Sequence, residues 1–492
     1  MSYYYYNYDD DDEQIDVDAD YDAIFEENQP IFEWESLYET CILPSTLQIS
    51  WYISVLLGWS LIGHIGITIC SRLKTKGDWL IHTISILTGY GVLIMTVGKK
   101  SYIVVGITVV SFIILHLIYQ FEVCKRNIGF IMLLFILSTH LSYELIWKRQ
   151  MAWEVIQGPI MITNMKTISI AFEMEESTLM NRHVRVFPSV FSFFGYIFMP
   201  TNLIIGPWVP YSTYLYSIRT DPLRRLCRRW IMWCFLCSII SLSFLNLSNC
   251  IVPLVFTERS PIWLRIFRDA LSVRCSHYFV SFLSQASIAI GGITLSKYEN
   301  PNAYLGYMIT QPLQIEFPRS LSTVVRTWNL PTHCFLKEYI FRRVYRRFGS
   351  HLIAIFATYL VSSLLHGEYL KIYLVLLSLA SFAYVEYKLR DKVANAFNAC
   401  VSANMCRKPC RFKFCPSHGW LSDGAILVIL TNVLFSLLTI FHLAYLGAIM
   451  TEATVEDEPE SIGFFDDLNL WSSVSYVNHW TALFTFFLYL VS

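Results

Sequence analysis

Residues Gly349 to Gly367 read GSHLIAIFATYLVSSLLHG, and this stretch decides the class of the protein. No charged residue lies between Arg347 and Glu368, and aliphatic residues fill most positions. A run of this length and polarity is typical of a helix that spans a membrane. His366 lies at its end, and an ionisable side chain in a membrane is a candidate functional residue. The alternative is a structural histidine that bonds to a neighbouring helix or lies in the interface.

The whole chain shares this apolar character. Of its 492 residues, 54% are hydrophobic and only 15% are charged, and its mean hydropathy is +0.45. A soluble domain carries about 25% charged residues. The composition therefore predicts an all-α, polytopic transmembrane helix bundle, with membrane lipid as its surroundings and no nucleic acid among its partners. No basic segment precedes the first apolar run, so we expect that run to act as a signal anchor.

Apolar length predicts about eleven spans, with re-entrant or interfacial helices between them. The predicted spans are Ser50–Cys70, Trp79–Val97, Ser101–Tyr119, Ile128–Ile146, Phe187–Ile205, Trp230–Pro253, Tyr278–Thr294, His351–His366, Ile372–Tyr387, Ala425–Ala448 and Val474–Val491. Glutamine, glycine, proline and lysine interrupt Trp153–Phe172, so we expect that stretch to be re-entrant or interfacial. The interval from Thr294 to His351 is too polar to span and too apolar for a free loop. It predicts short helices packed into the bundle.

Charge separates two sides of the predicted bundle. Residues 1–45 are acidic and tyrosine-rich, which is typical of a disordered tail, and residues 46–492 form the transmembrane domain. Basic residues gather after the first span and in the segments 219–229, 341–348 and 388–413, whereas a second acidic segment covers 452–467. With eleven spans, the basic segments lie in the cytoplasm and the acidic ones in the lumen. Only Lys99 and Lys100 disagree with this orientation.

A second polar element precedes the His366 span. Trp328–Asn329–Leu330–Pro331 places an amide 37 residues before the histidine. An imidazole takes a proton from an attacking hydroxyl near neutral pH. An amide orients a substrate or donates to a developing oxyanion. Together the two side chains suit acyl transfer, although Asn-Leu-Pro alone can simply mark a helix end.

These motifs resemble the membrane-bound O-acyltransferase family. The order is RS, six residues, TWNLP, a basic amphipathic segment and then SSLLHG. The likeness begins at about Trp153, and its collinear stretches are Met165–Glu175, Ile204–Leu215, Leu271–Ala286, Gln311–Ser320, Ala357–Gly367 and Phe441–Gly447. The family's paired asparagine and histidine fall on Asn329 and His366. Gln285 departs from the pattern, since a carboxylate is expected there.

The resemblance implies acyl transfer within the membrane, without a cofactor or metal. It is closest to the members that acylate Wnt proteins. This implies palmitoleoyl-CoA as donor, a serine of a Wnt protein as acceptor and the endoplasmic reticulum membrane as location. Trp328, Tyr359, Ser362 and Leu365 flank the pair in the matched motifs, so we expect them to line the substrate site or to serve ordinary helix packing.

Two other functions remain as alternatives. An acyltransferase for a lipid acceptor, such as a lysophospholipid or a sterol, would use the same asparagine and histidine. A transporter or receptor would perform no covalent chemistry, and the lack of an internal repeat argues against an inverted-repeat transporter.

The cysteines give weaker signals. The chain has 13, scattered along its length, which does not predict a disulfide framework. Cys406, Cys410, Cys415 and His418 follow one another in a basic loop, but their spacing is loose for a structural zinc site. We therefore predict reduced or S-acylated thiols and no metal.

Overall fold

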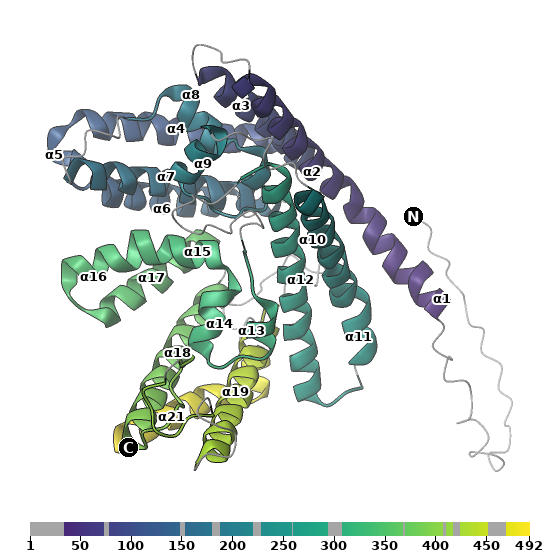
Figure 1. Ribbon diagram of the computed structural model, residues 1–492, viewed down its shortest axis with the longest axis vertical. Helices are drawn as coiled ribbons and strands as arrows, with labels where there is room; N and C mark the ends of the chain where they lie inside the picture. Colours follow the sequence, from purple (N-terminus) through teal and green to yellow (C-terminus); the bar gives the residue numbers. More distant parts are fainter. Residues whose placement is uncertain are drawn as a thin grey trace, which may run out of the picture.

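The computed structural model describes eleven stretches of the chain, and helices dominate them. These stretches are 34–72, 78–147, 153–179, 187–219, 228–257, 259–293, 308–367, 370–406, 410–416, 424–450 and 469–492. Within them the only β-type pairing is an isolated bridge between Ala399 and Phe414. Figure 1 shows α3 to α9 at one end of the molecule and α18, α19 and α21 at the other. The predicted all-α class is confirmed.

The helices differ widely in length. The long ones are α2 (Leu43–Arg72), α3 (Trp79–Val97), α4 (Ser101–Gln120), α6 (Ile128–Trp147), α7 (Trp153–Leu179), α10 (Arg228–Asn246), α12 (Ile262–Ile290), α17 (His351–His366), α18 (Leu370–Ala396), α19 (Ala425–Ala448) and α21 (Val477–Val491). The short ones are α1 (Trp34–Leu37), α5 (Glu122–Lys125), α8 (Val190–Ile197), α9 (Tyr211–Arg219), α11 (Val252–Val255), α13 (Pro312–Glu316), α14 (Leu321–Trp328), α15 (Leu330–Phe335), α16 (Arg342–Phe348) and α20 (Asn469–Ser473). Short π-type or 3-10 turns extend several of them, including η1 (Tyr38–Ile42), η2 (Gly98–Lys100), η3 (Pro200–Asn202), η5 (Leu247–Ile251) and η7 (Leu336–Phe341).

Membrane-length helices are present, but the count of eleven spans is not confirmed. Among the described residues, five helical segments are long and apolar enough to cross a membrane: Trp34–Arg72, Trp79–Gln120, Ile231–Val255, Lys371–Ala396 and Ala425–Ala448. Three shorter apolar helices cover Ile128–Tyr143, His351–His366 and Val477–Val491. The segment Trp79–Gln120 contains two helices, α3 and α4. They are separated at Gly98, whose φ of +68° ends α3.

Two predicted segments differ from the structure. Phe187–Ile205 contains only the eight residues of α8 and a short turn, which is too short to span. Trp153–Phe172 is not interrupted, since it belongs to the continuous 27-residue helix α7. Lys166 is tolerated there because its ammonium group is buried and donates to the Tyr196 and Ile197 carbonyls and to Asn202 Oδ1, at 2.8 to 3.0 Å. All three donors of the ammonium group are thereby satisfied.

The amino-terminal boundary also shifts. Helix begins at Trp34, inside the stretch that the sequence assigned to the acidic tail, and residues 1–33 lie outside the described part. Cys41 of η1 forms a disulfide with Cys250 of η5, which fixes the start of the described chain to the turn after α10. The sequence did not predict this pairing, because the two cysteines lie 209 residues apart.

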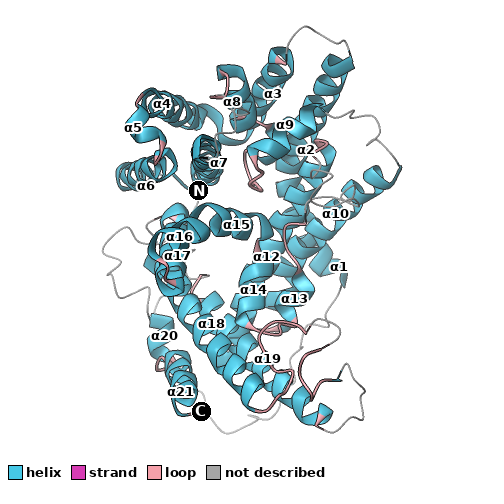
Figure 2. Ribbon diagram, turned by 60° about the vertical axis from the view of Figure 1, so that its left-hand side comes forward, coloured by secondary structure: helices cyan, strands magenta, loops and turns pink. Residues whose placement is uncertain are grey.

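The interval before the His366 helix is built as predicted. From residue 308 onward it consists of α13, α14, α15, η7 and α16, while residues 294–307 lie outside the described part. Figure 2 shows α12, α14, α15 and α17 bordering one central region of the molecule. Among these elements, α14 and α17 carry predicted site residues, and Asn329 lies between α14 and α15.

Candidate active site

His366 is the last residue of α17. The hydroxyl of Ser350 accepts a hydrogen bond from the Ile353 amide and caps the start of the helix, and Gly367 ends it with a φ of +101°. Only glycine adopts that backbone conformation readily, so the SLLHG sequence stops the helix directly after the histidine. The His366 side chain is exposed although Leu365 and Gly367 are buried. The imidazole is therefore accessible at a helix end that is otherwise packed.

The predicted lining residues of α17 divide between two faces. Tyr359 and Ser362 lie seven and four residues before His366, which places all three on one face of the helix. Both are half-buried. Leu365 is 4% exposed and packs in the main hydrophobic core, together with Val361 and Ala354. Tyr359 and Ser362 thus accompany the imidazole, whereas Leu365 holds the opposite side of the helix.

Asn329 occupies the break between α14 and α15. Its backbone is extended, with φ −142° and ψ 91°, and its Oδ1 accepts a hydrogen bond of 3.1 Å from the Thr332 amide. Asparagine is a preferred residue for this capping role, and Pro331 suits the first turn that follows. Because the oxygen is used by the cap, the side chain presents its Nδ2 hydrogens as donors. The half-buried Asn329 thus has the chemistry of an oxyanion donor.

The backbone on both sides of Asn329 is fixed by neighbouring segments. The Trp328 carbonyl accepts a hydrogen bond from His277 Nε2 at 2.8 Å, and the two rings stack with centroids 4.3 Å apart. The Leu330 amide donates to the Ile309 carbonyl at 2.8 Å. Trp328 therefore packs against His277 with its indole ring, which orients the asparagine that follows it.

A partly buried ion pair holds α13, which precedes this segment, to α12. Arg274 donates to both carboxylate oxygens of Glu316, at 2.8 and 3.1 Å, and Tyr278 donates to one of them at 2.7 Å. Bidentate pairs of this kind fix geometry as well as charge. Helix α12 thus carries both His277, which bonds Trp328, and Arg274, which bonds Glu316 of α13, three residues apart.

His277 bonds the residue before Asn329 and lies in the neighbourhood of His366. His277 and His140 of α6 lie close enough to His366 for a positive charge on one ring to disfavour a charge on another. The His366 carbonyl accepts a hydrogen bond of 2.6 Å from Gln157 of α7. Three helices, α6, α7 and α12, therefore each place a side chain near the end of α17.

His277, His140 and Gln157 were not among the residues predicted from the sequence. His277 lies within Leu271–Ala286, a stretch that matched the acyltransferase family, and this was the available signal. His140 and Gln157 gave no such signal, because nothing in their local sequence distinguishes them from packing residues. Their proximity to His366 depends on the packing of α6 and α7 against α17.

The arrangement can support a hydroxyl attacking a carbonyl carbon. The imidazole is accessible to accept the proton, and the amide hydrogens of Asn329 can donate to the oxygen that gains negative charge. No serine or cysteine nucleophile is required if the acyl group passes directly from donor to acceptor.

Comparison with known proteins identifies the class of this molecule. The model of the membrane-bound O-acyltransferase family matches residues 128–407, a range that contains both Asn329 and His366. The chain belongs to this family and is an acyltransferase that resides in a membrane through several helices.

The most similar relatives share one name. The chain is 39% identical over 360 residues to the protein-serine O-palmitoleoyltransferase porcupine of Drosophila melanogaster, covering 71% of this chain and 66% of that protein. It is 30% identical over 479 residues to the Anopheles gambiae protein of the same name, covering 93% and 94%. Lysophospholipid acyltransferase 6 of Drosophila melanogaster is 20% identical over 349 residues, covering 62% and 46%.

Proposed function

We propose that the protein transfers a palmitoleoyl group from palmitoleoyl-CoA to a serine of Wnt proteins at the endoplasmic reticulum membrane. The observation that carries this proposal is the 30% identity over 93% of the chain with a protein-serine O-palmitoleoyltransferase. The lower identity and smaller coverage of the lysophospholipid acyltransferase favour a protein acceptor over a lipid acceptor.

In the proposed reaction His366 is the general base. Its imidazole removes the proton from the serine hydroxyl as the oxygen attacks the thioester carbonyl carbon. A carbon–oxygen bond forms and the carbon–sulfur bond breaks. The imidazolium then returns the proton to the departing thiolate, which leaves as coenzyme A. The accessible side chain of His366 at the end of a packed helix supports this assignment.

Asn329 stabilises the oxygen of the thioester carbonyl during the attack. Its Nδ2 hydrogens are directed by the cap that occupies Oδ1. His277 and Trp328 hold the backbone in place, so that the donor does not have to reorganise when charge develops. Tyr359 and Ser362 lie beside the imidazole, where they contact the acyl chain or the acceptor.

The test is acyl transfer with purified protein. Labelled palmitoleoyl-CoA is incubated with a folded Wnt hairpin peptide and with a lysophospholipid in the same vesicle preparation. We expect label on the peptide and none on a matched peptide whose acceptor serine is alanine. Label on the lipid alone would favour the lipid acyltransferase, and label on neither would contradict both. Co-fractionation with endoplasmic reticulum markers tests the location.

A further inference from the structure

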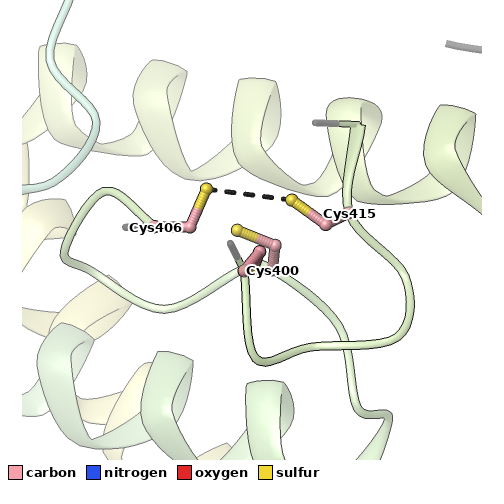
Figure 3. A group of neighbouring side chains, drawn as sticks. Cys400, Cys406 and Cys415 are labelled. Atoms are coloured by element: carbon pink, nitrogen blue, oxygen red, sulfur yellow. Dashed lines mark hydrogen bonds between the residues drawn. The ribbon is translucent and has the colours of Figure 1, made fainter. Parts of the chain in front are cut away.

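Four cysteine side chains converge in the loop between α18 and α19. They are Cys400, Cys406, Cys410 and Cys415, and their sulfur atoms all lie within 4.8 Å of one another. Figure 3 shows three of them turned toward a common centre. None of the four belongs to a disulfide. The sequence grouped Cys406, Cys410 and Cys415 with His418, which lies outside the described residues. In the structure the fourth member of the group is Cys400.

The spacing of these sulfur atoms suits a tetrahedral metal ion. Zinc binds thiolate sulfur at about 2.3 Å, and the edge of such a tetrahedron is about 3.8 Å. The separation between Cys406 Sγ and Cys415 Sγ is 3.8 Å. A disulfide requires about 2.05 Å. Four neutral thiols packed for their apolar character alone would not need this common centre.

The surrounding loop is built to hold the cysteines in place. The Cys400 amide donates to the Phe414 carbonyl at 2.8 Å, and the Phe414 amide donates to the Asn398 carbonyl at 3.0 Å. Asn432 of α19 donates to the Cys400 carbonyl at 3.0 Å. The loop has only a small hydrophobic cluster of its own, formed chiefly by residues of this region and Val428. Small segments with little core commonly depend on a structural metal.

The charge around the cluster also suits a metal. Four thiolates and one divalent ion carry a net charge of −2. Arg319 lies with Nη2 3.9 Å from Cys400 Sγ and donates to the carbonyls of Cys400 and Ser402, each at 3.0 Å. A guanidinium group at this position offsets the negative charge and orients the loop.

The cluster lies at the opposite end of α19 from the disulfide. Cys250 is two residues from Ser248, and the Ser248 hydroxyl donates a hydrogen bond to the Ser272 carbonyl of α12. This part of α12 packs on the last turns of α19, where Ala270 contacts the same hydrophobic cluster as Ala444. The disulfide therefore lies near the carboxyl end of α19. The four cysteines instead adjoin Val428, near the first residues of α19. The 24 residues of this helix extend about 36 Å, more than the hydrocarbon thickness of about 30 Å.

The two groups of cysteines thus face opposite compartments if α19 crosses the membrane. Disulfides persist in oxidising compartments, whereas thiolates that bind zinc persist where thiols stay reduced. The Cys41–Cys250 disulfide marks one side as oxidising, and the four-cysteine cluster lies on the other side. This arrangement favours a metal over a second pair of disulfides.

We propose that Cys400, Cys406, Cys410 and Cys415 bind one structural Zn²⁺ ion. The ion fixes the loop against Arg319 and Ser320. Ser320 donates to the Ala403 carbonyl at 3.1 Å and caps α14, the helix that ends next to Asn329. The zinc site therefore helps to hold α14 in place, and α14 ends next to the candidate catalytic residue Asn329. It does so from the reducing side of the membrane.

The test measures metal in the full-length protein, purified in detergent through a tag without histidines and without chelators. Elemental analysis is expected to find about one zinc per chain. Cys410→Ser should lower this to near zero, and Cys410 is chosen because it is less buried than Cys400 and Cys415. Cys124→Ser, which changes a cysteine outside the cluster, should retain the zinc. Removing the ion with a chelator under denaturing conditions should make four additional thiols available to alkylation, compared with the folded, metal-loaded protein.

Three results would overturn the proposal. One is wild-type protein with far less than one zinc per chain and thiols that alkylate fully without prior metal release. A second is a disulfide among the four cysteines in protein from non-reducing preparations. A third is iron with acid-labile sulfide, which indicates an iron–sulfur cluster. The wild-type measurement decides the matter even if Cys410→Ser does not fold.

Discussion

Replacing Asn329 by serine separates the two tasks that the structure gives to this residue. The Oδ1 atom caps α15 through a 3.1 Å bond from the Thr332 amide, and the Nδ2 hydrogens are the proposed donors to the oxyanion. A serine hydroxyl can take over the cap, because serine and asparagine are comparable N-cap residues. It cannot reproduce the amide donor. Asn329→Ser therefore removes the proposed catalytic group and retains the helix start.

The expected sizes follow from these two contacts. Loss of one preorganised oxyanion donor costs about 3–4 kcal/mol, which lowers kcat by about 10²–10³-fold. Loss of an N-cap costs about 1 kcal/mol of stability. Asn329→Ser should thus show the full decrease in kcat with a thermal midpoint near wild type. Asn329→Ala should show a similar decrease in kcat and a lower thermal midpoint.

The assay combines single-turnover transfer of labelled palmitoleoyl groups with thermal unfolding in detergent. Ser189→Ala is the matched control, since Ser189 caps α8 by accepting from the Ser192 amide and belongs to no part of the candidate site. It should lower stability and leave the rate unchanged. Wild-type kcat in Asn329→Ser would refute the reasoning, because the residue would then serve only to start α15.

Three further predictions concern the base, the membrane orientation and the acyl chain. His366→Ala should lower turnover by about 10²–10⁴-fold. The wild-type rate should fall at acidic pH as the imidazole becomes protonated, and His366→Ala should flatten this acidic limb of the pH–rate profile. An unchanged acidic limb in the residual activity would assign the base to another group. A glycosylation acceptor inserted near Asp20 should be modified in microsomes and one appended after Ser492 should not. The charge distribution predicts a lumenal amino-terminal end, and the Cys41–Cys250 disulfide favours an oxidising compartment on that side. The reverse pattern would invert the topology. Shortening the donor chain should reduce binding by only about 0.8 kcal/mol per methylene, whereas lengthening it should stop transfer through steric clash; equal rates with C14 and C18 donors would contradict a closed acyl site.

The helical membrane class and the acyltransferase family follow from the amino-acid sequence alone. Apolar runs such as Gly349–Gly367 can satisfy their backbone in a membrane only as helices, so length and composition alone led to an all-α bundle. The spacing of TWNLP and SSLLHG led to Asn329, His366 and the acyltransferase family, because these motifs are local and survive in the linear order of residues.

Tertiary packing decided what local patterns cannot encode. Lys166 lies within a continuous helix because three acceptors from another segment surround it, so a residue that looked like an interruption is satisfied. His277 stacks on Trp328 across 51 residues of sequence, and Cys41 reaches Cys250 across 209. Cys400 joins three other cysteines because an Asn398–Phe414 backbone pairing closes the loop, and this closure made a candidate zinc site out of spacing that appears too loose along the chain. In each case the deciding contact is between segments that are distant in sequence, and its geometry exists only after the helices have packed.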